Sequence, residues 1–178
     1  GSVYLQLARA EIRAAGVRGG GRVLDPVAGC GTTVIEAASM GVEGHGVDAN
    51  PLAVLVSQAK LSMLGREPDR LAADLASLLM PPRVGIDVGD PEYLAEWLPE
   101  DNYRYLGRLL AALKALPTDD LRAIGAVIVS SAIREASWQD PRQLRVGRRA
   151  PNDDPRDLSE LVDEAFTEAI AVLRAARA

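Results

Sequence analysis

The stretch over residues 22–51 constrains the fold more than any other part of the chain. It opens with a short apolar strand, 23–24, that runs into an acid, and a loop with two glycines follows. A helix over 34–40 and a second strand over 42–47 come next, and the second strand also ends at an acid. This order predicts an α/β unit in which each of two strands carries a carboxylate at its carboxyl end.

The loop between the first strand and the helix is suited to bind a ligand. Gly29 and Gly31 let the backbone turn sharply and approach a ligand closely. The helix that Thr32 and Thr33 begin presents unpaired N–H groups to the loop, although a simple capping role is the alternative for both threonines. Asp48 follows about 20 residues after the first glycine, where an acid can accept hydrogen bonds from ribose hydroxyls.

The same residues exclude two common nucleotide-binding loops. Val34 replaces the third glycine of a dinucleotide fingerprint, and the Gly-Lys-Ser/Thr sequence of a phosphate loop is absent from this stretch. Asp25 would repel a pyrophosphate and suits a cationic or amine-bearing ligand instead. S-adenosylmethionine, a nucleoside with a positive charge, fits both Asp25 and Asp48.

These motifs resemble those of a known family. Residues 25–33, DPVAGCGTT, and residues 46–51, GVDANP, resemble the cofactor half of S-adenosylmethionine-dependent DNA methyltransferases that methylate amino groups. Those enzymes typically show Asp-Pro-Phe-x-Gly-x-Gly-Thr-Thr and then Gly-x-Asp-x-Asn-Pro. Val27 stands here in place of the aromatic residue, and Cys30 in place of the usual serine. Methyltransferases that act on RNA guanines carry a similar first motif, so the substrate is less constrained than the cofactor.

The resemblance implies a fold, a cofactor and a reaction. The fold is α/β, with a partial Rossmann-like class I methyltransferase sheet and a large helical segment, in which the helix over 3–15 closes one side of the cofactor pocket. The reaction is direct in-line methyl transfer from S-adenosylmethionine to an exocyclic amine of a DNA base. The cofactor-binding residues carried over from the motifs are Asp25, Pro26, Ala28, Gly29, Cys30, Gly31, Thr32, Thr33, Asp48, Ala49 and Asn50.

The catalytic motif of the resembling enzymes is missing from the sequence. They hold the target amine with Asp/Asn/Ser-Pro-Pro and an aromatic residue, and no such tetrapeptide occurs here. Pro81-Pro82, between Met80 and Arg83, is interpreted as a helix breaker. We therefore expect the cofactor-binding part of a longer or split enzyme. The alternatives are a non-catalytic subunit that partners a catalytic chain, and a methyltransferase for RNA or a small molecule.

The rest of the chain is predicted to be mostly helical. We expect an α/β part over 1–90 and a helical segment over 91–178, with Thr118 as the N-cap of an apolar helix at the centre of a bundle. A short strand over 84–88 is also predicted. The sheet of the resembling enzymes has seven strands, so an open edge would remain, which a second chain or a missing segment must cover. The further predicted helices cover residues 51–64, 70–80, 93–98, 102–116, 121–137 and 157–178.

Charge and cysteine content limit the partners and the compartment. The formal net charge of −5 does not suggest a free-standing nucleic-acid binder, but a local basic cluster could contact DNA phosphates. One cysteine excludes an internal disulfide and fits a reducing cytoplasm. We expect neither a membrane span nor a metal site. The basic cluster comprises Arg142, Arg145, Arg148 and Arg149, and ion pairs with Asp153, Asp154 and Asp157 are its alternative role.

Overall fold

The computed structural model describes residues 2–143 and 145–176. The chain divides into two compact units, Gly1–Gly65 and Arg66–Ala178, and each is described by itself. The structure is mixed α/β, mostly helical with a short parallel sheet, which confirms the predicted fold class.

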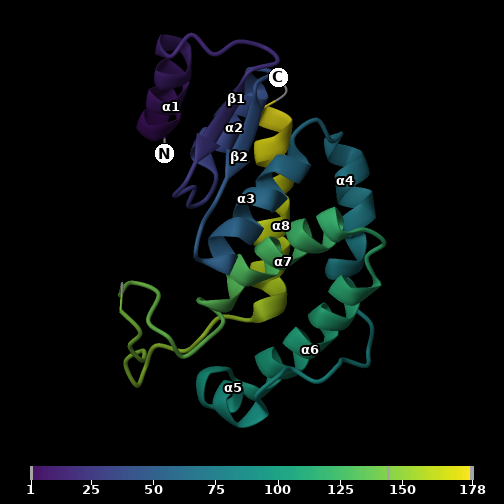
Figure 1. Ribbon diagram of the computed structural model, residues 1–178. Helices are drawn as coiled ribbons and strands as arrows, with labels where there is room; N and C mark the ends of the chain where they lie inside the picture. The colour runs from purple at the N-terminus through teal and green to yellow at the C-terminus, as the bar shows by residue number, and fades with distance from the viewer. Residues whose placement is uncertain (1, 144, 177–178) are drawn as a thin grey trace. The chain divides into compact units, whose positions relative to one another are not determined.

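The first unit contains the sheet and three helices (Figure 1). The strands are parallel, with Arg22 opposite Glu43 and Asp25 opposite Gly46. Because both strands run in one direction, their carboxyl ends lie at the same edge of the sheet, as the strand–loop–helix–strand prediction requires. The elements in chain order are α1 (Ser2–Ala14), β1 (Arg22–Asp25), α2 (Thr32–Ser39), β2 (Glu43–Gly46) and α3 (Pro51–Met63).

A small apolar core joins α1, α2 and one face of the sheet. Ile12, Ala37 and Val42 are buried, and Val23 of β1 packs against them. Beside this core, the Arg9 guanidinium Nε donates a hydrogen bond to the carboxylate of Glu36 at 2.7 Å. The Glu36 side chain is only 10% exposed, so this ion pair is partly shielded from water and fixes α1 against α2.

The opposite face of the sheet is uncovered. Successive side chains of a strand point to opposite faces, and Leu24, next to the core residue Val23, is 65% exposed. Val47, just after β2, is 59% exposed. Within the residues that the structure describes, β1 and β2 pair only with each other, so each strand has a free edge.

The second unit is a helical bundle in which α7 and α8 lie side by side (Figure 1). The side-chain hydroxyl of Thr118 accepts a hydrogen bond from the Leu121 N–H at 3.3 Å, which confirms the predicted N-cap of α7. No helix among the described residues is long and apolar enough to cross a membrane. The elements are α4 (Pro68–Leu75), the 3₁₀ turn η1 (Ala76–Leu78), α5 (Pro91–Trp97), α6 (Glu100–Ala115), α7 (Asp119–Ile133) and α8 (Leu158–Ala175).

The predicted position of α7 at the centre of the bundle is confirmed. Most of its large apolar side chains are buried, and it packs against α4, α6 and α8. Since α4 belongs to this bundle, the boundary between the units falls after Gly65 and not at residue 90. The last two residues of the predicted helix over 157–178 lie outside the described residues.

Residues 84–88 do not form the predicted strand. Instead the segment between η1 and α5 crosses α6, where the Ile86 N–H donates a hydrogen bond to the Gly107 carbonyl at 3.0 Å. A strand needs a partner strand for its backbone groups, and the described part of this unit contains no strand long enough to offer one. The Gly107 carbonyl of α6 takes the place of a partner strand for one backbone group, the Ile86 N–H.

Candidate functional site

The loop between β1 and α2 is tied to the chain that follows β2. The Val47 N–H donates to the carbonyl of Asp25 at 2.9 Å, and the Ala28 N–H donates to the carbonyl of Val47 at 3.0 Å. The Gly31 N–H then closes the loop onto the Ala28 carbonyl at 2.8 Å. These bonds continue the parallel pairing beyond the strands, so the loop has a defined shape at the edge of the sheet.

Asp48 braces this loop from the side of β2. Its Oδ2 accepts a hydrogen bond from the Gly29 N–H at 2.8 Å, and its Oδ1 accepts one from the Asn50 N–H at 2.8 Å. The bond from Asn50, followed by that from Gly29, lowers the pKa of the Asp48 carboxyl below its ordinary value of 3.8. The group is therefore ionised at neutral pH, and its oxygens keep lone pairs for further donors.

Two polar side chains of α3 donate hydrogen bonds to the backbone of this loop. The Ser57 hydroxyl donates to the Gly29 carbonyl at 2.9 Å, and the Lys60 ammonium donates to the Cys30 carbonyl at 3.3 Å. Neither residue was predicted from the sequence. Their spacing of three residues on a largely apolar helix was the available signal, since such residues share one face.

The helix α2 starts at a glycine and not at a threonine cap. Gly31 is its N-cap, with φ of 81°, and no side chain accepts a hydrogen bond from the first turn. Thr32 and Thr33 are the first two helical residues, so the capping alternative does not describe them. The first N–H groups of an α-helix have no partner within the helix, and they attract negatively charged groups.

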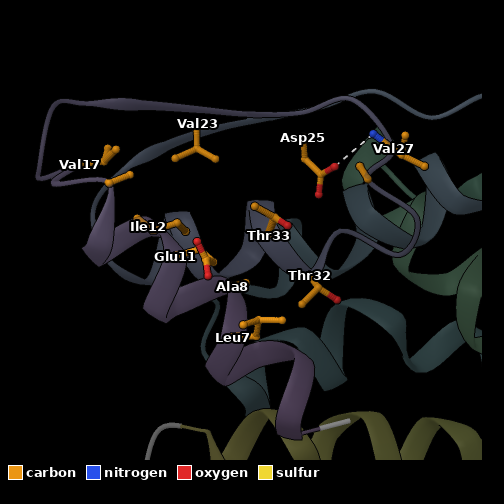
Figure 2. Close-up of a pocket in the computed structure, with 12 residues that line it drawn as sticks. Leu7, Ala8, Glu11, Ile12, Val17, Val23, Asp25, Val27, Thr32 and Thr33 are labelled. Carbon is orange, nitrogen blue, oxygen red and sulfur yellow. Dashed lines mark hydrogen bonds between the residues drawn. The ribbon is translucent and has the colours of Figure 1, made fainter.

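A hollow of about 600 Å³ lies between α1, β1 and the start of α2. In Figure 2, Val23 and Asp25 lie on one side, Leu7 and Glu11 of α1 on the other, and Thr33 between them. This position confirms that α1 lines one side of a pocket. One oxygen of the Asp25 carboxylate accepts a hydrogen bond from the Val27 N–H at 3.1 Å, and its other oxygen has no partner among the described residues.

A second hollow, of about 210 Å³, lies between α2, β2 and α3. Asp48, Gly29 and Ser57 line it, and Ala28 lines both hollows. The structure therefore brings Asp48 to the glycine loop, but it places the two predicted acids in different hollows that meet at Ala28.

The remaining predicted cofactor residues lie at the rim of the loop. Pro26, Cys30 and Ala49 are exposed, and Asn50 acts as the N-cap of α3 by accepting a hydrogen bond from the Leu52 N–H at 3.0 Å. The part of the chain that the structure describes contains no group of three or more His, Cys, Asp or Glu side chains that could hold a metal ion.

Two members of the predicted basic cluster in the second unit are engaged in ion pairs. Arg142 pairs with Asp140 at 2.8 Å and with Asp153 at 2.7 Å. The side chain of Arg149 is 7% exposed and pairs with Asp153 at 3.1 Å. The ion-pair alternative thus describes both arginines, with Asp153 as their shared partner.

The other two members, Arg145 and Arg148, form no ion pair among the described residues. The Arg148 guanidinium lies over the ring of Trp97, 5.7 Å from its centroid, and donates to the carbonyl of Glu96. Arg145 is exposed, and the described residues give it no partner. Contact with a nucleic acid stays a prediction for this cluster.

Asp140 makes this segment sensitive to acid. Its hydrogen bonds with the Arg142 side chain and backbone lower its pKa from 3.8 to about 2. Because the pKa of Asp140 is lower in the folded chain than in the unfolded chain, its ionised carboxylate stabilises the fold at any pH above the unfolded pKa. We expect this stabilisation to be lost as the pH falls from about 4 toward about 2. Tryptophan fluorescence can follow this loss of stability. Both tryptophans of the chain lie at this segment, since the backbone N–H of Trp138 donates to the backbone carbonyl of Trp97 at 2.7 Å. An acid titration of the fluorescence should show a transition between about pH 4 and about pH 2, and Asp140→Asn should diminish that transition. An unchanged titration in the variant would assign the transition to other carboxylates.

Comparison with known proteins identifies the first unit. Residues 1–66 match the family model described as the RMKL-like methyltransferase domain. The first unit therefore matches a methyltransferase domain over its whole length. Both hollows and the braced loop lie within the matched residues.

Two relatives support this assignment to the methyltransferases. The chain is 24% identical over 141 residues to the Type II methyltransferase M.MvaI of Kocuria varians, covering 73% of this chain and 31% of that enzyme. It is 34% identical over 94 residues to the tRNA (guanine(10)-N2)-dimethyltransferase of Methanothermobacter thermautotrophicus, covering 52% of this chain and 28% of that enzyme. The chain thus spans less than a third of each relative's length. No solved structure matches it.

Proposed function

We propose that the first unit binds S-adenosylmethionine and that the chain is the cofactor-binding part of a methyltransferase for an exocyclic amine of a DNA base. The observation that carries the proposal is the glycine loop braced by Asp48 beside a hollow of about 600 Å³, inside the methyltransferase segment. Pockets for small molecules occupy roughly 300–1,000 Å³, so the size suits this cofactor.

The groups around the loop fit the chemistry of S-adenosylmethionine. The unpaired oxygen of the Asp25 carboxylate can bind the ammonium group of the cofactor or face the positive charge of its sulfonium. The N–H groups at the uncapped start of α2 can bind the carboxylate of the cofactor. Asp48 lines the second hollow and keeps acceptor capacity for ribose hydroxyls, so the proposal requires the cofactor to extend past Ala28 into that hollow. When bound, the cofactor supplies an electrophilic methyl group on sulfur. The protein's part here is to position and align that cofactor, and not to act as acid or base.

The exocyclic amine as the acceptor has support from a relative. The name of the tRNA relative assigns its methyl groups to N2 of a guanine, which is an exocyclic amine. DNA is preferred over RNA because residues 25–33 and 46–51 resemble the motifs of the amino-methylating DNA enzymes. The similarity to the Type II enzyme covers 73% of the chain, against 52% for the tRNA enzyme. RNA is the alternative substrate.

A completed sheet is part of the proposal. Leu24 and Val47 are 65% and 59% exposed, and the two strands have free edges. Further strands, from a second chain or from another stretch of the same protein, would pair with these edges, and the helices that connect parallel strands would cover the face at Leu24. Native mass spectrometry of the purified protein shows whether a second chain is present.

Methyl transfer by the native assembly tests the proposal. The assembly is incubated with methyl-labelled S-adenosylmethionine and with either double-stranded DNA or tRNA. We expect label on amino groups of DNA bases. Label on tRNA alone would select the RNA alternative, and cofactor binding without transfer to either nucleic acid would select a non-catalytic subunit.

A further inference from the structure

Arg108 of α6 is held in place without losing its charge. Its Nε and one Nη donate to the carbonyls of Pro82 and Pro81 at 2.8 and 3.1 Å, and its guanidinium lies 5.2 Å from the centre of the Tyr105 ring. Carbonyl oxygens are neutral acceptors, so they orient the guanidinium and leave its positive charge available. The Pro81-Pro82 pair, interpreted from the sequence only as a helix breaker, thus also positions a cation.

The crossing of the 80–90 segment over α6 brings a second arginine to the same place. A Cβ on Gly85 would lie 2.7 Å from the carbonyl carbon of Gly107 and 2.8 Å from the Arg108 nitrogen. Only glycine permits so close a backbone approach. Arg83, two residues before this crossing, lines the same hollow as Arg108.

The hollow at this crossing has a volume of about 300 Å³ and no acid in its lining. Arg83, Arg104 and Arg108 line it together with Ile86, Val88 and Tyr103. Arg104 pairs with Glu100, whereas Arg83 and Arg108 form no ion pair within the described residues. Two guanidinium groups without an ion pair among the described residues thus line one hollow.

A neighbouring hollow of about 400 Å³ shares the three arginines but differs in charge. Asp101 and Asp157 also line it, and both would repel an anion. The hollow at the crossing is therefore the one suited to an anion. We propose that it binds a backbone phosphate of a nucleic acid, a proposal that rests on the proposed nucleic-acid substrate.

The lining favours a nucleic acid over a free phosphate ion. The planar guanidinium fork matches the oxygens of a phosphate. The hollow also has an apolar and aromatic surface, to which an inorganic ion would make no favourable contact. This surface is formed by Ile86, Val88 and Tyr103. A sugar or an unpaired base attached to the phosphate can pack or stack on such a surface.

Salt-dependent binding of labelled oligonucleotides to the whole chain tests the site. The variants are Arg83→Ala and Arg108→Ala, with Lys114→Ala as the matched control, because Lys114 is an exposed cation on α6 that lines neither hollow. Loss of one phosphate contact should weaken binding by about fivefold to tenfold near about 0.1 M salt and reduce the salt slope by about one unit. Lys114→Ala should bind like the unaltered chain. Circular dichroism checks that each variant is folded.

Two outcomes would overturn the site. One is an affinity of Arg108→Ala that is no lower than that of Lys114→Ala. The other is competition by inorganic phosphate at the same concentration as by an oligonucleotide phosphate. The binding measurement is repeated with single-stranded DNA, double-stranded DNA and RNA, and the nucleic acid whose affinity depends most on Arg83 and Arg108 is the one that supplies the phosphate. S-adenosylmethionine binding is measured in parallel. If the cofactor binds but the arginine variants bind nucleic acid normally, only the phosphate site is wrong. If the chain binds no cofactor, the proposed function is wrong.

Discussion

Replacing Asp48 with alanine is expected to weaken S-adenosylmethionine binding by about tenfold or more and to leave the chain folded. The carboxylate receives the Gly29 and Asn50 N–H groups, each at 2.8 Å, and it lines the smaller hollow beside the loop. Its removal frees the loop and deletes the acceptor proposed for the ribose. Equilibrium dialysis with labelled cofactor measures the loss.

Glu43→Ala is the matched control for this prediction. Glu43 is the first residue of β2 and lines neither hollow. Its exposed carboxylate pairs with Arg22 at 3.0 Å and contacts the His45 ring at 2.9 Å. The control removes one negative charge near Asp48 in the sequence without removing a bond to the glycine loop, so it should bind the cofactor like the unaltered chain. Equal affinities for Asp48→Ala and Glu43→Ala would show that Asp48 has no part in binding.

Gly31→Ala is expected to lower the free energy of unfolding of the first unit by about 2–5 kcal/mol. Gly31 has φ of 81°, a region that costs an alanine about 1–2 kcal/mol. An added Cβ would also lie 2.7 Å from the Ser57 hydroxyl and 3.2 Å from the Ser57 Cα. Ser57 cannot turn away without losing its hydrogen bond to Gly29, and its backbone is close as well.

Gly41→Ala separates the two causes. Gly41 has φ of 69°, but a Cβ there would meet nothing within 4 Å. We therefore expect a loss of about 1–2 kcal/mol from the backbone conformation alone. Urea denaturation followed by circular dichroism measures both variants. A loss at Gly31 no larger than that at Gly41 would mean that the loop does not pack on α3 as described.

The strand–loop–helix–strand unit could be predicted from the sequence because its signals are local. Glycines mark the loop, an acid ends β1 and another follows β2, and proline stands in the first turn of α3. The N-cap role of Thr118 followed in the same way. In each case a residue acts on backbone groups close to it in sequence, which a pattern can show.

Features that depend on distant segments could not be predicted. The Ser57 hydroxyl, for example, reaches a carbonyl 28 residues away in the sequence. The strand expected over 84–88 failed because its backbone pairs with α6, and its apolar residues alone gave no sign of that partner. The separation of Asp25 and Asp48 into two hollows likewise depends on where α1 and α3 pack.

Calorimetric titration of the folded chain with S-adenosylmethionine tests the central claim most directly. The account predicts saturable binding near one cofactor per chain, competed by S-adenosylhomocysteine and weakened in Asp48→Ala. A folded chain in its native assembly that releases no heat and retains no labelled cofactor on dialysis would contradict it.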